Sequence, residues 1–63
     1  RPMRFDTREQ AEGAAMYRSK QESGSVIYIC EQRRYWYAWR EPELPEKSDS
    51  YFILGAAEKG RLA

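Results

Sequence analysis

The chain has 63 residues with 11 basic and 10 acidic side chains, so its formal net charge is +1. A domain of this size buries only about 60% of the surface that its unfolded chain exposes, and it usually needs a disulfide, a metal or a partner as well. One cysteine and no histidine exclude an internal disulfide and leave no ligand set for structural zinc, so the composition favours a homodimer or another protein partner and no metal.

Composition also bounds the class of protein. Two tryptophans, five tyrosines and two phenylalanines in so short a chain predict a folded domain rather than a disordered one. No apolar run approaches the ~20 residues that cross a membrane, and no signal peptide is recognisable. Because a lone cysteine is typical of a reducing compartment, we expect a cytoplasmic protein with no membrane partner.

The N-terminal segment predicts an arm followed by a helix. Residues 1–5 are expected to form a basic, extended N-terminal arm. Asp6 with Glu9 has the spacing of a capping box, in which side chains satisfy the free backbone N–H groups at the start of a helix. Thr7 with Gln10 has the same spacing, so the helix is expected to begin at one of these two caps.

The predicted helix has an inner face of small side chains. It is expected to run to about Gln21 and to end before Gly24. At 100° per residue, Ala11, Ala14 and Ala15 form one narrow stripe along it. Small side chains let a helix lie close to what it covers, so this stripe predicts tight packing on a sheet.

Two strands are predicted after the helix, at residues 25–30 and 35–40, because β-branched and aromatic side chains dominate both segments. The polar residues between them have hairpin length, and we expect Tyr28 to lie opposite Tyr37. The face toward the helix is expected to hold Ile27, Ile29, Trp36, Ala38, Phe52 and Leu54. The second face is expected to hold Val26, Tyr28, Cys30, Tyr35, Tyr37, Trp39 and Tyr51.

The C-terminal third is expected to be less regular. Residues 41–49 form an acidic, Pro-containing loop that is too polar to be buried. Residues 51–54 predict a third strand, and residues 56–63 predict a short helical turn or a frayed tail. The sequence therefore predicts one small α+β domain, with a single N-terminal helix packed on a short antiparallel sheet in the order α-β-β-β.

Catalysis finds little support in the sequence. Without histidine, general acid–base chemistry at neutral pH lacks its usual side chain. Cys30 is the strongest nucleophile, but it lies in a predicted strand with no base to activate it. Phosphate-loop, dinucleotide and calcium-loop patterns are absent from the sequence. We therefore expect no enzyme and no cofactor.

Aromatic and basic residues around the predicted hairpin are the main candidates for binding. One helix covers only one face of a sheet, so the second face is expected to present an apolar-aromatic patch of the kind that marks interaction sites. Tyrosine, tryptophan and arginine are also the residues most enriched at binding hot spots. The candidate binding residues are Tyr28, Arg33, Arg34, Tyr35, Tyr37, Trp39 and Arg40.

Three interpretations of these residues remain open. The preferred one is a small accessory or regulatory protein whose exposed Tyr/Trp face self-associates, as a homodimer, or docks a protein partner. The alternative is a single-stranded nucleic-acid-binding module, in which aromatic rings stack on bases and Arg33, Arg34 and Arg40 neutralise phosphates. In the third, the loop or the tail covers the rings and no partner is involved.

Overall fold

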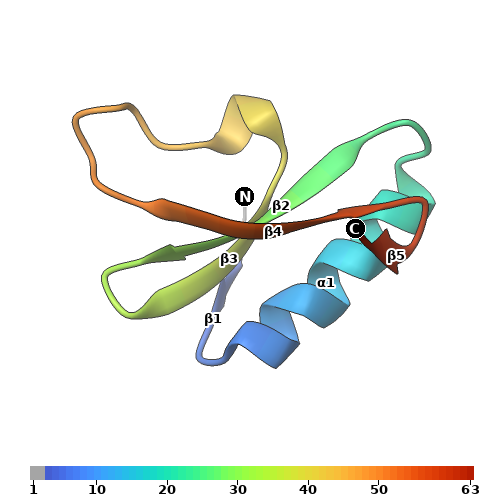
Figure 1. Ribbon diagram of the computed structural model, residues 1–63, viewed down its shortest axis with the longest axis horizontal. Helices are drawn as coiled ribbons and strands as arrows, with labels where there is room; N and C mark the ends of the chain where they lie inside the picture. Colours follow the sequence, from blue (N-terminus) through green and yellow to red (C-terminus); the bar gives the residue numbers. More distant parts are fainter. Residues whose placement is uncertain (1–2) are drawn as a thin grey trace.

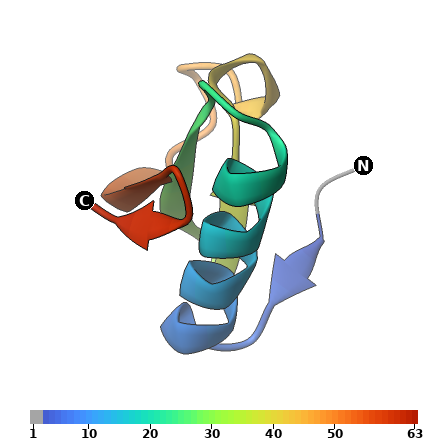
Figure 2. The same ribbon diagram turned by 90° about the vertical axis from the view of Figure 1, so that its right-hand side faces the viewer.

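The structure, a computed structural model, describes residues 3–63 and confirms the α+β class (Figure 1). Its elements are β1 (Arg4–Phe5), α1 (Arg8–Gln21), β2 (Val26–Gln32), β3 (Tyr35–Trp39), the 3-10 helix η1 (Glu41–Glu43), β4 (Phe52–Glu58) and β5 (Arg61–Leu62). The five strands form one antiparallel sheet in the order β1-β3-β2-β4-β5. The helix packs on one face of this sheet, with β1 on one side of it and β5 on the other (Figure 2).

The start of α1 is fixed by the second of the two predicted caps. Thr7 has an extended backbone and forms the N-cap. Its hydroxyl accepts a hydrogen bond from the Gln10 backbone N–H at 3.2 Å, and the Gln10 side chain accepts one from the Thr7 N–H at 3.3 Å. Two backbone N–H groups that the helix itself cannot satisfy thereby gain partners. The predicted end at Gln21 is also confirmed.

The core forms where the alanine face of α1 meets the sheet. Ala11 and Ala15 are fully buried, as the predicted stripe requires, whereas Ala14 is only partly buried. Trp36 packs against this core but keeps part of its surface exposed. The buried hydrophobic core cluster consists of Ala11, Ala15, Ile27, Ile29, Ala38 and Ala57. With four alanines among its six members, the core depends on close approach of helix and sheet rather than on large side chains.

The β2–β3 hairpin confirms the predicted faces but not the predicted pairing. Tyr28 lies opposite Trp39, and Tyr37 lies opposite Cys30, so the pairing of Tyr28 with Tyr37 was wrong by two residues. The reason is a tighter turn than expected, in which only Arg33 and Arg34 are unpaired. A shift by two residues keeps every side chain on the same face, which is why the face assignment holds.

Both ends of the chain are more ordered than predicted. Part of the arm at residues 1–5 forms β1, where Phe5 pairs with Trp36; residues 1–2 lie outside the described part of the chain. Residues 56–63 form neither a helical turn nor a frayed tail, because β4 runs on through Glu58 and turns back into β5. Ala57 is fully buried in the core, which anchors this part of the chain.

Two side chains at and beside a β-bulge in β4 were assigned to the wrong environment. Ile29 pairs with Gly55 and Cys30 pairs with Ile53, so Leu54 is an extra residue without a partner on β2. Because of this insertion, Phe52 lies opposite Glu31 on the face that α1 occupies, but its side chain is mostly uncovered there. Leu54 is 44% exposed and Phe52 is 62% exposed, and the prediction that both pack under the helix was therefore wrong.

Candidate binding surfaces

Part of the second face of the sheet is covered rather than open. Trp39 is only 5% exposed and Cys30 is fully buried. The chain between Arg40 and Tyr51 loops back beside the sheet, and the Tyr51 ring meets Trp39 edge-on at 6.3 Å between centroids (Figure 1). The expectation that Trp39 lies on an exposed face was therefore wrong, and Tyr51, which was assigned to the same face, is one of its aromatic neighbours.

Two of the other rings of this face, Tyr35 and Tyr37, already have partners. Tyr37 stacks on Trp39 with their centroids 4.3 Å apart and an interplanar angle of 17°. The guanidinium of Arg4 lies over the Tyr35 ring, 4.0 Å from its centroid. Tyr28, Tyr35 and Tyr37 are each half-buried. Few ring faces are therefore free for bases to stack on, which weakens the stacking part of the nucleic-acid interpretation.

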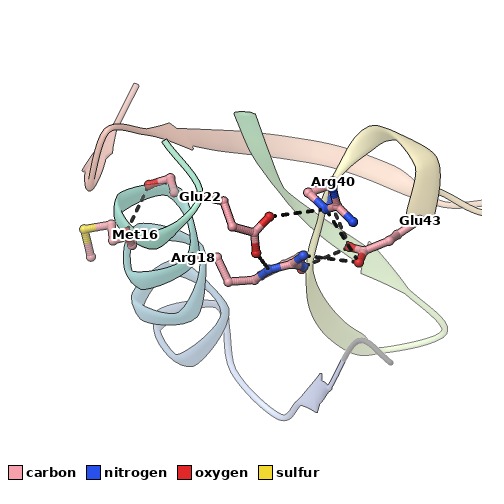
Figure 3. Close-up of polar contacts among 7 residues, drawn as sticks. Met16, Arg18, Glu22, Arg40 and Glu43 are labelled. Atoms are coloured by element: carbon pink, nitrogen blue, oxygen red, sulfur yellow. Dashed lines mark hydrogen bonds and ion pairs between the residues drawn. The ribbon is translucent and has the colours of Figure 1, made fainter. Parts of the chain in front are cut away.

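Arg40, a predicted binding residue, belongs to an ion-pair network that connects the helix to the loop (Figure 3). Arg18 on α1 contacts Glu43 of η1 through its guanidinium, with Nη1 2.8 Å from Oε1 and Nη2 3.2 Å from Oε2. Glu22 joins both arginines, since its carboxylate lies 3.2 Å from Arg18 Nε and 3.3 Å from Arg40 Nε. The Arg18 Nη1 also donates to the Ala38 carbonyl oxygen at 2.9 Å. These contacts give Arg40 a structural role.

Electrostatics in this network favour the ionised carboxylate. The hydrogen bonds from the Arg18 guanidinium lower the pKa of Glu43, and they outweigh the desolvation that opposes ionisation. The same contact raises the pKa of Arg18. Because Glu43 binds protons less readily in the folded chain than in the unfolded one, the free energy of unfolding has to fall in acid.

We expect Glu43→Gln to remove part of the acid sensitivity of the fold. The contribution of the ionised Glu43 is fully present above its unfolded pKa of about 4.3 and is lost as the pH falls through its lower folded pKa. Wild type should exceed Glu43→Gln in free energy of unfolding at pH 6, and the gap should close below pH ~4. Urea titrations across this range measure it; a constant gap would contradict the coupling.

Three consecutive exposed apolar side chains lie together on β4. Phe52, Ile53 and Leu54 are 62%, 47% and 44% exposed, and we call these three residues the β4 edge. β5 pairs with Ala57 and Glu58 alone among the described residues, so the outer side of the β4 edge has no strand beside it (Figure 1). Sequence reasoning missed this surface because it depends on the bulge and on where β5 ends.

The turn between β2 and β3 gathers the remaining predicted residues. Arg33 and Arg34 are exposed, and Tyr35 follows directly with Arg4 above its ring. The structure thus brings Arg33, Arg34 and Tyr35 together at one end of the sheet. Tyr28, Tyr37 and Trp39 form a separate aromatic layer, and Arg40 lies apart from both groups in its ion-pair network.

The single thiol is held in its unreactive form. Cys30 is buried on β2, and this desolvation raises its pKa to about 11. The thiolate is the nucleophile and the metal ligand, so Cys30 is protonated and inert at neutral pH. Across residues 3–63, no group of three acidic, Cys or His side chains is placed to hold a metal ion, and no helix has the length and apolarity to cross a membrane.

Comparison of the chain with protein-family models, with curated proteins and with solved structures finds no significant match. Function therefore has to be inferred from the surfaces themselves. Two of them stand out: the apolar, unpaired β4 edge and the basic β2–β3 turn.

Proposed function

We propose that this protein is a non-catalytic binding protein that self-associates by strand addition along the β4 edge. The observation that supports it is the coincidence of three consecutive exposed apolar side chains with an unpaired stretch of strand. Contiguous exposed apolar surface marks interaction sites. An edge without a neighbouring strand offers backbone donors and acceptors to another strand, and here the Leu54 carbonyl oxygen already accepts a side-chain hydrogen bond, from Arg8 at 2.9 Å. A role in a reducing compartment such as the cytoplasm is consistent with the free thiol of Cys30.

The arrangement of these side chains favours a strand over a flat partner. Ile53 lies opposite Cys30 on the second face, whereas Phe52 lies opposite Glu31 on the face that α1 occupies. A partner surface resting on one face of the sheet would leave one of these side chains in water. A strand added at the edge lies beside both faces and can contact both side chains, as in β-augmentation.

A second copy of the chain fits this edge for reasons of symmetry and charge. An antiparallel strand can pair with its own copy about a two-fold axis, which gives the isologous interface of most dimers. Residues 50–57 carry no charged side chain, so such pairing brings no like charges together. Sheet edges are usually protected by charges, by very short strands or by bulges, and of these the β4 edge has only the bulge at Leu54. The two outermost strands have the first two features, since each has two residues and they include Arg4 and Arg61.

We therefore expect Ile53→Lys to abolish the dimer. A lysine in the middle of the edge places two positive charges near the two-fold axis and removes an apolar contact from each subunit. Sedimentation equilibrium at about 100 µM, well above the dissociation constant of a specific micromolar dimer, should give a dimer for wild type and a monomer for Ile53→Lys. Circular dichroism should show the same secondary structure in both.

The matched control is Tyr17→Lys. Tyr17 is 67% exposed on α1, and its replacement adds the same charge and removes comparable apolar surface away from β4. This variant should remain a dimer. A wild-type monomer at 100 µM, or equal dissociation of the two variants, would contradict self-association through this edge.

A further inference from the structure

The β2–β3 turn has a backbone conformation that its side chains do not favour. Arg33 and Arg34 have φ values of 53° and 72°, and a two-residue hairpin turn with both φ values positive has the pattern of type I′. That turn favours Asn-Gly, because residues with a Cβ resist the left-handed region. Two arginines in such a turn are an unusual pair, and strain of this kind is characteristic of functional sites.

The second hairpin of the same chain has a turn of the same kind whose residues suit its backbone. The β4–β5 turn is Lys59-Gly60, with φ values of 53° and 81°, so it follows the same pattern with glycine in the second position. Position 34 requires a positive φ in the same way, but arginine and not glycine occupies it. Folding therefore does not account for arginine at this position.

The charges around this turn are free to bind a ligand. Arg4, Arg33 and Arg34 take part in no ion pair within residues 3–63. The other arginines of the helix and of the β3 end, Arg8, Arg18 and Arg40, are each paired with glutamate. The nearby Glu31 carboxylate accepts a hydrogen bond from the Arg34 backbone N–H at 3.0 Å and so holds the turn in place.

We infer that this hairpin tip, consisting of Arg4, Arg33, Arg34 and Tyr35, binds the phosphate backbone of single-stranded nucleic acid. Guanidinium groups bind phosphate oxygens through paired N–H donors. The turn projects from one end of the sheet, where a flexible strand can bend around it (Figure 1). Three cations are few for a duplex, which favours a single strand as the occupant. The half-buried Tyr35 ring offers an edge to a neighbouring base.

The test is fluorescence anisotropy of a labelled 12-nucleotide single strand titrated with the full chain at several salt concentrations. Three neutralised phosphates predict a slope of about −2 for the logarithm of affinity against the logarithm of salt concentration. The double variant Arg33→Asn/Arg34→Gly should lose at least about tenfold in affinity and flatten the slope by more than half, since it keeps only Arg4. The same variant should melt at least about 4 °C higher, because its turn residues match the backbone.

Two comparisons make the outcome decisive. Lys59→Asn removes a cation from the equivalent position of the other hairpin and should leave oligonucleotide affinity within about twofold. Equal losses in both variants, an unchanged affinity in the double variant, or tighter binding to phosphatidylserine vesicles than to the oligonucleotide would overturn the inference. The double variant should have the same sedimentation behaviour as the wild type. A failure of the nucleic-acid proposal can therefore be told apart from a failure of the proposed pairing along the β4 edge.

Discussion

Ile27→Ala should lower the free energy of unfolding by about 2–5 kcal/mol, the largest effect expected of a single substitution in this chain. Ile27 is fully buried on β2 and is one of the two large aliphatic side chains in the core cluster. Its neighbours in that cluster are mostly alanines on rigid elements, so they are too short to fill the resulting cavity. For a domain of this size, such a loss is a large part of the total stability.

The control for that substitution is its neighbour Val26, half-buried on the opposite face of β2. Val26→Ala should cost about 1 kcal/mol or less, because only part of its surface leaves water on folding. Urea denaturation of both variants measures the difference. Equal losses would mean that the core does not lie between α1 and the sheet.

Arg18→Ala should destabilise the fold by about 2–3 kcal/mol, the second largest effect, and Arg8→Ala should cost no more than about 1 kcal/mol. The two arginines form a natural pair for comparison. Each donates to a sheet carbonyl at 2.9 Å, Arg8 to Leu54 and Arg18 to Ala38. Each also lies 3.2 Å from the glutamate four residues later. Only Arg18 additionally binds Glu43.

The difference between these variants therefore isolates the attachment of the loop to the helix. Side-chain exposure of 24% for Arg18 and 22% for Glu43 means that breaking the pair leaves a partly desolvated carboxylate without its cation. A double-mutant cycle with Glu43→Gln should give a coupling of at least about 1 kcal/mol. Identical stabilities of Arg18→Ala and Arg8→Ala would show that the network does not hold the loop.

Local sequence signals predicted the parts of the fold that depend on neighbouring residues. The cap at Thr7, the end of α1 and the two faces of the hairpin follow from spacing and alternation within a few residues. The β4–β5 turn also has a local signal, because the glycine of Lys59-Gly60 suits the second position of a type I′ turn. The tight turn at Arg33-Arg34 has none, because arginine is not a residue that type I′ turns favour.

Long-range packing determined what sequence reasoning missed. The bulge at Leu54 has no marker in the sequence beyond the neighbouring Gly55, and the exposure of Phe52 on the α1 face depends on how far the helix covers the sheet. The Arg18–Glu43 contact joins residues 25 positions apart, with nothing local to indicate it. Tyr51 was assigned to the same face as Trp39, but the burial of Trp39 to 5% exposure was not predicted. For these reasons the proposed interface is the β4 edge and not the Tyr/Trp face that the sequence predicted.

Amide hydrogen exchange of residues 52–55, measured as a function of protein concentration, tests strand addition at the β4 edge most directly. Along β4, backbone N–H groups directed at β2 alternate with groups directed outward. Pairing with a second copy engages the outward-facing groups, so their protection should rise with concentration. Amides of Ile27 and Ile29, which lie inside the sheet, report global stability for comparison. The proposal predicts concentration-dependent slowing at residues 52–55 that Ile53→Lys removes. Exchange there that is fast and equal at 10 µM and 1 mM, across the range of specific dimers, would contradict it.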